Sequence, residues 1–226
     1  MDRKTYELLE CHMRSCMTDS AHDEDHVYRV LYAALDIAEH EVGVDTDVLI
    51  CACLLHDIGR AEQFENPALC HAVVGAEKAR KFLLAQGFDR SFAERVGECI
   101  KTHRFRSDAP PASIEAKILF DADKLDVTGT IGIARTIFYQ GQVGEPLYSL
   151  QSDGQVSDGT GDTEPSFLQE YKYKLEGLYS KFYTDHGWKM AAQRQAAAAA
   201  FYRSIVEEAR SVYDTGRALL ERKLSE

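Results

Sequence analysis

Apolar residues recur at helical spacing along most of this chain. Runs in which apolar and polar residues alternate, as they do in half-buried strands, are scarce. The pattern therefore predicts an all-α protein. The predicted helices lie at residues 2–17, 21–41, 47–58, 68–86, 91–103, 113–140, 167–183 and 188–214.

Capping signals mark several of the predicted helix ends. Ser20 and Ser91 each precede an acidic residue by three positions, which is the pattern of a capping box. Asp45 or Thr46 is expected to cap the helix that contains the apolar run VLICACLL. Gly59 is expected to end that helix in the left-handed C′ position.

One long stretch departs from the helical pattern. Residues 141–166 are rich in Gly, Ser and Asp, and a loop of this length is either a lid or an unstructured segment. We expect a single domain over residues 1–226, with a core at about 18–140, the flexible loop, and C-terminal helices at about 167–220.

Composition and charge exclude several classes of function. The chain is 45% hydrophobic and 28% charged, so a packed soluble core is expected. No apolar run is long enough to span a bilayer, and the N-terminus lacks a secretory signal, which predicts a cytoplasmic protein. A net charge of −11 disfavours binding to nucleic acids or anionic membranes. A bound cation with local Arg or Lys residues can still reverse the sign within one pocket.

The six cysteines include no C-x-x-C pair, so buried reduced thiols are expected. Cys53 lies three residues before His56, on nearly the same helical face. A thiolate at Cys53 would suit zinc, but nothing else in the chain completes such a site.

The stretch LLHDIGR places His56 and Asp57 at the end of the apolar run. Burying an imidazole and a carboxylate without partners is costly. Further buried candidates are His26, His71 and His103, and the stretch FDADKLD adds three carboxylates. One central divalent ion would satisfy several of these groups, and nitrogen and oxygen ligands suit Mn, Fe, Ni, Co or Zn, and Mg to a lesser degree. The remaining histidines, His12, His40 and His186, are interpreted as surface or core residues.

Five stretches together resemble the HD-domain superfamily of metal-dependent phosphohydrolases, in particular its small single-domain bacterial members. The resemblance implies an HD-domain helical bundle with an appended C-terminal helical pair. The stretches are HDEDHVYRV at 22–30, LLHDIGR at 54–60, IKTHRF at 100–105, AKILFDADKLDVTGTIGIAR at 116–135 and EYKYKLEGLYSKFYTDHGWKMAAQR at 170–194.

The resemblance implies four metal ligands, which fall on His26, His56, Asp57 and Asp123. Asp123 is preferred to Asp121 because it directly precedes Lys-Leu, where the ligand of the family lies. The neighbouring carboxylates, Asp121 and Asp126, are expected to orient ligands or to pair with Lys or Arg. For Asp126 a salt bridge on the helix face is an equal alternative.

His71 and His103 have two interpretations. Some relatives hold a second metal with comparable histidines, and others have one metal and use such a histidine for the substrate. The sequence favours one tightly held ion, with His103 near the phosphate. His22 and Asp23 are expected either to support the site or to serve as capping or surface residues.

The implied reaction is attack by a water molecule that the metal activates, and the chain contains no motif for a side-chain nucleophile. The expected catalytic residues are Asp57, Arg60 and His103. Substrate binding is assigned to Arg60, His103 and Lys124. Arg60 suits phosphate oxygens but is also compatible with an ordinary surface role, and Lys124 can instead pair with the acidic cluster.

The resemblance implies a nucleotide or related phosphate ester or anhydride as substrate. The expected partners are this small molecule and a second copy of the chain in a homodimer, with neither a nucleic-acid polymer nor a membrane. The alternatives are a di-iron HD-fold oxygenase that uses His71 and His103, and a non-catalytic nucleotide-binding signalling module. A helical bundle with a structural metal is disfavoured, because closed structural sites prefer Cys-rich ligand sets.

Overall fold

The computed structural model describes residues 1–17, 24–104 and 110–226, and its regular structure is helical. No β-strand occurs within these ranges, although one isolated bridge pairs Leu150 with Val156. The predicted all-α class is confirmed. No helix in the described ranges is both long enough and apolar enough to cross a bilayer.

The chain divides into two compact units. The first comprises Met1–Asp126 and Phe182–Lys189, and the second comprises Val127–Lys181 and Met190–Glu226. Helix α10, Asp185–Ser225, begins in the first unit and ends in the second. The residues that the sequence assigned to the metal site all belong to the first unit.

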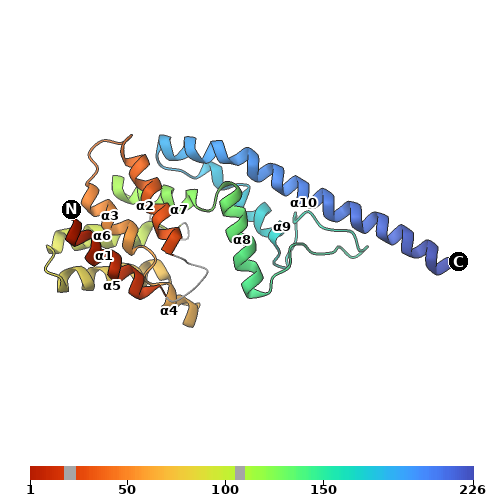
Figure 1. The fold of residues 1–226 in the computed structure, drawn as a ribbon, viewed down its shortest axis with the longest axis horizontal. Coiled ribbons are helices and arrows are strands. Elements are labelled where there is room, and N and C mark those ends of the chain that lie inside the picture. The colour runs from red at the N-terminus through yellow and green to blue at the C-terminus, as the bar shows by residue number, and fades with distance from the viewer. Residues whose placement is uncertain (18–23, 105–109) are drawn as a thin grey trace. The chain divides into compact units, whose positions relative to one another are not determined.

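Helix α3 forms the centre of the first unit and packs against α1, α2, α6 and α7 (Figure 1). Within its apolar run, the five successive residues Cys51 to Leu55 all have 0% exposure. A helix that is apolar all round is expected in a core. The helices of this unit are α1 (Arg3–Cys16), α2 (Glu24–Ala38), α3 (Thr46–Leu55), α4 (Arg60–Glu65), α5 (His71–Ala85), α6 (Arg90–Thr102) and α7 (Ile114–Leu125).

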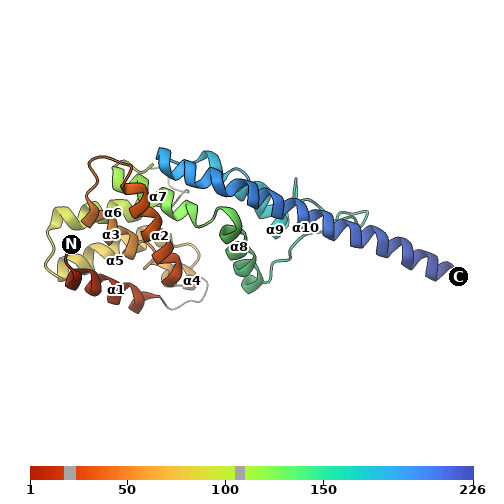
Figure 2. The same cartoon turned by 45° about the horizontal axis from the view of Figure 1, so that its top comes forward.

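Two pairs of helices pack within the first unit. Helix α5 packs along α6, and α2 packs along α7, as the views in Figure 1 and Figure 2 both show. These pairings bring the N-terminal ends of α2 and α5 and the C-terminal ends of α3, α6 and α7 into one region. The predicted metal ligands and the two open histidines lie at these ends.

The caps differ in part from the sequence predictions. Asp45 caps α3, because its side chain accepts hydrogen bonds from the backbone N–H groups of residues 47 and 48 at 3.2 Å. Helix α6 begins earlier than predicted, because Asp89 rather than Ser91 is its cap and accepts from the N–H of Ser91 at 2.6 Å. The predicted capping box at Ser20 lies outside the described residues.

Gly59 does not end α3 in a left-handed conformation. Helix α3 ends at Leu55, and Gly59 has φ −98° and precedes α4. Glycine is needed at this position because there is no room for a side chain. A Cβ atom at Gly59 would lie 2.4 Å from the carbonyl oxygen of His71 and 2.6 Å from the nitrogen of Gly75. The turn that carries His56 and Asp57 therefore approaches the backbone of α5 closely.

The chain from residue 113 onward is less regular than predicted. The pattern at 113–140 forms two helices, α7 and α8 (Gly129–Val143), and Gly129 has φ +64° at the break. Residues 167–183 form short pieces rather than one helix, whereas α10 extends beyond the predicted 188–214. The short pieces are α9 (Phe167–Glu170), the π-helical turn Tyr171–Leu175 and the 3₁₀ turn Leu178–Ser180.

The connection between α8 and α9 contacts α10 within the second unit. Its backbone carbonyls accept hydrogen bonds from the Tyr202 hydroxyl at 2.7 Å, from Arg210 Nε at 3.0 Å and from Arg217 Nη1 at 2.9 Å. Tyr202 also stacks on Tyr171, with ring centroids 4.2 Å apart. The loop predicted at 141–166 is thus anchored at several points along this helix.

Replacing Gly59 by alanine is expected to destabilise the first unit. The added Cβ atom would meet backbone atoms, which cannot move as a flexible side chain can. We expect the free energy of unfolding of the metal-free chain to fall by about 1–3 kcal/mol, measured by urea denaturation.

Gly141→Ala is the matched control for this change. Gly141 lies near the end of α8, and a Cβ atom added there would have no neighbouring atom within 4 Å. Alanine at this position is expected to leave stability unchanged or to raise it by up to about 1 kcal/mol. Equal effects of the two substitutions would contradict the packing argument.

Candidate metal centre

His26 and His56 face each other across the first cluster of candidate ligands. His26 lies in the first turn of α2, and His56 directly follows α3. The His26 Nδ1 atom is 2.7 Å from Asp126 Oδ2, and the His56 Nδ1 atom is 2.7 Å from the Cys53 carbonyl oxygen. Because a carbonyl and a carboxylate only accept, each Nδ1 atom donates and each Nε2 atom keeps a lone pair. The two Nε2 atoms lie 3.3 Å apart.

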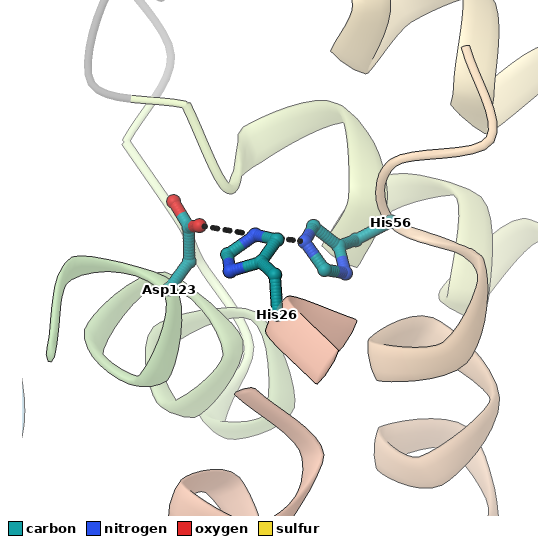
Figure 3. Close-up of side chains that lie close together, drawn as sticks. All are labelled: His26, His56 and Asp123. Atoms are coloured by element: carbon teal, nitrogen blue, oxygen red, sulfur yellow. Dashed lines mark hydrogen bonds and ion pairs between the residues drawn. The ribbon is translucent and has the colours of Figure 1, made fainter. Parts of the chain in front are cut away.

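Two carboxylates complete this cluster. Asp123 Oδ1, from α7, is 3.6 Å from His26 Nε2, and Figure 3 shows His26 between Asp123 and His56. Asp57 Oδ2 is 3.5 Å from His26 Nε2 and 3.6 Å from His56 Nε2. All four ligands predicted from the resemblance therefore meet in one place.

His71 and His103 form a second cluster on the other side of Asp57. His71 is the first residue of α5, and His103 directly follows α6. Their Nδ1 atoms lie 2.6 Å from Gln63 Oε1 and from the Ile100 carbonyl oxygen. Their Nε2 atoms are 3.3 Å apart and lie 3.5 and 3.7 Å from Asp57 Oδ1.

Asp57 links the two clusters, with one oxygen directed to each. Both oxygens are buried and make no hydrogen bond. The nitrogens around them also carry lone pairs, so acceptors face acceptors. Bonds of about 2.1 Å to one ion place ligand atoms about 3.0–3.4 Å apart at octahedral or tetrahedral angles. The observed spacing and the orphaned carboxylate oxygens therefore fit bound cations.

Burial keeps His56, His71 and His103 neutral. It lowers the pKa of His71 to about 2 and that of His103 to about 4. It also lowers the pKa of His56. Neutral imidazole is the form that binds metals, so these rings are available as ligands at neutral pH.

The two carboxylates remain ionised in spite of burial. Burial acts to raise the pKa of Asp57, but the charge of Arg60 is the main cause that outweighs it and holds that pKa well below its usual range. Burial likewise acts to raise the pKa of Asp123, but the charge of Lys124 is the main cause that outweighs it and lowers the pKa. Both side chains are therefore anionic and available as metal ligands.

Three cationic side chains lie at or beside the clusters. Arg60 Nε is 3.0 Å from Asp57 Oδ1, although not in hydrogen-bond geometry. Lys124 Nζ is 2.9 Å from Asp123 Oδ2. Arg104, which follows His103, contacts only the Cys70 sulfur, at 3.6 Å, among the interactions of the described residues. Two of these cations thus already contact the carboxylates that would ligate a metal.

The two carboxylates flanking Asp123 have different roles. Asp126 combines both predicted alternatives, since it accepts from His26 and forms a two-pronged ion pair with Arg29 at 2.7 and 3.1 Å. Asp121 contacts no ligand. It accepts instead from the backbone N–H groups of Tyr183 and Thr184, and thereby secures the segment before α10.

Sequence reasoning missed Gln63 and Arg29 as supporting residues. Arg29 lies three positions after His26 on the same face of α2, so helical spacing offered a signal for it. Gln63 reaches His71 from a separate short helix, which no local pattern indicates. The predicted supporting pair His22 and Asp23 lies outside the described residues.

Cys53 contributes its carbonyl oxygen rather than a thiolate. Burial raises the pKa of its thiol well above the usual value, so the sulfur stays protonated. All six cysteines are free, and those at 51, 53 and 99 are buried. Cys11, by contrast, is exposed.

Comparison with known proteins places these helices in a family. A family model described as HD domain matches residues 24–128. The chain is 30% identical over 211 residues to the uncharacterized protein YpgQ of Bacillus subtilis (strain 168), a match that covers 91% of this chain and 94% of YpgQ.

Solved structures show the same fold. The crystal structure of Bacillus subtilis YpgQ in complex with ADP has a TM-score of 0.70 and 26% identity, covering 90% of this chain and 97% of that one. A predicted HD superfamily hydrolase from an uncultured Thermotogales bacterium has a TM-score of 0.60 and 29% identity, covering 89% and 91%. A Lactobacillus plantarum protein of 24% identity has a TM-score of 0.72, with 92% and 98% covered.

The residues matched by the family model include helices α2 to α7, which carry both clusters. The identity to YpgQ extends over nearly the whole of both chains. This chain therefore belongs to the HD-domain family.

Proposed function

We propose that the two clusters hold two divalent cations that share Asp57. His26, His56, Asp123 and Asp57 Oδ2 would hold one, and His71, His103 and Asp57 Oδ1 the other. The observation that carries the proposal is that, in each cluster, two Nε2 atoms with lone pairs lie only 3.3 Å apart. Asp57 lies between the two clusters, and neither of its oxygens makes a hydrogen bond. The sequence favoured one ion, and the second cluster is the reason to propose two.

The ligand set suits Mn, Fe, Co, Ni or Zn better than Mg, because four of the six side chains are imidazoles. Bound there, such an ion supplies Lewis-acid chemistry, since it lowers the pKa of a coordinated water molecule and neutralises charge on a phosphate. The protein contributes a buried, preorganised set of ligands and the cations beside them.

We propose that the chain hydrolyses a phosphoester or phosphoanhydride bond of a nucleotide or related phosphate ester. Two relatives support this assignment. One is described as an HD superfamily hydrolase, and YpgQ was crystallised with ADP. The chain also carries the cationic side chains that an anionic substrate requires at this centre.

Arg60 and Lys124 are the proposed phosphate-binding residues. Arg60 contacts Asp57 through Nε, which leaves its terminal nitrogens to donate to a phosphate oxygen. Lys124 contacts Asp123 with one of its three donors. Arg104, beside the second cluster, is a further proposed contact for a phosphate.

We propose that Asp57 and His103 serve as oriented ligands and do not transfer protons. Arg60 keeps Asp57 ionised, so that both of its oxygens remain available as ligands. The bond from His103 Nδ1 to the Ile100 carbonyl directs Nε2 into the centre. If the second ion is absent, this Nε2 atom would instead face the phosphate, as the sequence suggested.

A di-iron oxygenase is the second candidate function. The specific observation in its favour is that one carboxylate separates two histidine pairs, an arrangement that also suits two irons. Oxygen consumption that depends on iron, without phosphate release, would support this alternative.

A cytoplasmic location and a homodimer stay predictions.

Turnover is expected to require a divalent metal. After chelation, nucleoside mono-, di- and triphosphates and p-nitrophenyl phosphate should be assayed with Mn, Co, Ni, Mg and Zn for release of phosphate or pyrophosphate. We expect His56→Ala and Asp123→Ala each to lower kcat/KM by more than about 100-fold, because each change removes a ligand.

His12→Ala is the matched control for these two variants. His12 lies on α1 and stacks on Phe82, away from both clusters. Its removal should leave kcat/KM within about threefold of the wild type. Hydrolysis that persists unchanged in both ligand variants would refute the assignment, and specific nucleotide binding without turnover would favour a signalling module.

Two Mn²⁺ ions per chain are expected after equilibrium dialysis and elemental analysis. His71→Gln should lower this number to one, because the first cluster keeps all of its ligands. Asp57→Asn should weaken binding at both positions, since each uses one of its oxygens. An unchanged count in His71→Gln would show that the second cluster holds no ion.

The metal-free chain is expected to lose stability as the pH falls from about 6.5 to 4. The unfolded chain binds protons at its histidines in this window, whereas folded His103, with a pKa of about 4, stays neutral. Each such histidine contributes a slope of up to about 1.4 kcal/mol per pH unit.

The check is urea denaturation in chelator between pH 4.5 and 7. His103→Gln should reduce the slope of unfolding free energy against pH by up to about 1.4 kcal/mol per pH unit, which corresponds to one proton. The lowered pKa values of Asp57 and Asp123 act mainly below about pH 4.5, so they contribute little within this window, and they are present in both proteins. Identical slopes in the two proteins would contradict the protonation states assigned here.

A further inference from the structure

A third group of potential ligands lies on the surface of the first unit. Asp36 belongs to the last turns of α2, His40 lies two residues beyond its end, and His186 is the second residue of α10. Each offers one donor atom within 4.8 Å of the donor atoms of the other two. The sequence assigned both histidines to isolated surface or core positions, but the fold brings them together.

The ring of His40 is held in a form that suits a ligand. Its Nδ1 atom lies 3.0 Å from the Asp36 carbonyl oxygen, which only accepts. The ring therefore donates from Nδ1 and keeps its lone pair on Nε2. His56 and His103 in the metal centre are oriented by the same contact to a preceding carbonyl.

His186 carries a nitrogen that lacks a hydrogen-bond partner. Its Nε2 atom is buried, makes no hydrogen bond and lies 3.4 Å from Asp36 Oδ1. The ring stacks on His40, with centroids 3.6 Å apart and planes within 8°. A carboxylate and two imidazoles thus lie close together, and one buried nitrogen has no hydrogen-bond partner.

We propose that Asp36, His40 and His186 form a separate binding site for Zn²⁺ or a similar late transition-metal ion. Two imidazoles and one carboxylate, with water in the remaining position, are a ligand set that zinc accepts. Stacked rings cannot both direct a nitrogen at one ion, so the exposed His40 ring has to turn and give up its bond to the Asp36 carbonyl oxygen when the ion binds. Asp36 is exposed as well, so this adjustment does not repack the core.

The site would connect two segments that are distant in sequence. His40 follows α2, which carries His26, and His186 follows Thr184, whose backbone N–H donates to Asp121 at 2.7 Å. A bound ion would therefore fasten the segment Phe182–Lys189 to α2 within the first unit. This site is independent of the proposed hydrolysis and needs none of its ligands.

The test counts zinc bound per chain and compares wild type with Asp36→Asn and His186→Gln. Zinc is titrated in competition with a chromophoric chelator, and the bound metal is measured by elemental analysis after gel filtration. We expect the wild type to bind one more zinc ion than either variant, or to bind that ion at least about tenfold more tightly. Mn²⁺, the weakest binder among the divalent first-row transition metals, should not reveal this difference.

His12→Gln is the control, since it removes a histidine outside every cluster. It should bind as much zinc as the wild type. The unfolding midpoint of each variant without zinc shows whether it is folded. Asp36→Asn changes an exposed side chain, so it still tests the proposal if His186→Gln is unstable. Equal zinc binding in the wild type and a folded Asp36→Asn variant would overturn the proposal, as would an equal loss in His12→Gln.

Discussion

The hydrogen bonds that fix the histidine rings are the interaction on which the centre depends. The Nδ1 atoms of His56 and His103 each donate to the carbonyl three residues earlier, at the C-terminal ends of α3 and α6. Carbonyls at a helix end lack the regular partner four residues on, and the Ile100 carbonyl has besides the ring only the long 3.4 Å bond from the His103 backbone N–H. The ring contact thus supplies a partner at the helix end and determines which nitrogen faces the centre. The placement of ligands at helix ends and their orientation therefore have a common cause.

This arrangement concentrates hydrogen-bond acceptors in a buried space. Their burial opposes folding unless cations offset its free-energy cost. Arg60 and Lys124 match the charges of Asp57 and Asp123, and Arg29 matches Asp126. Since the side chains alone are balanced, divalent ions would add an excess of positive charge. An excess of that kind would favour a phosphate substrate locally, although the chain as a whole carries a net charge of −11.

The sequence predicted what local patterns and residue chemistry determine. The buried helix α3, the cap at Asp45 and the convergence of His26, His56, Asp57 and Asp123 follow from apolar spacing, capping chemistry and the family resemblance. It could not predict that Gly59 is required by the approach of α5, because that contact is tertiary. The pairing of His40 with His186 was missed for the same reason, since no local pattern relates residues so distant in sequence.

The two clusters rest on different parts of the scaffold. The first is built on α2, α3 and α7, and the second on the ends of α5 and α6. The packing of α2 on α7 positions the first, whereas the second requires α5 to approach the turn at Gly59 within backbone contact. Among the described residues, Asp57 is the candidate ligand that they share. A change in the position of α5 would thus alter the second cluster and leave three candidate ligands of the first in place, so metal occupancy of the two proposed positions need not rise and fall together.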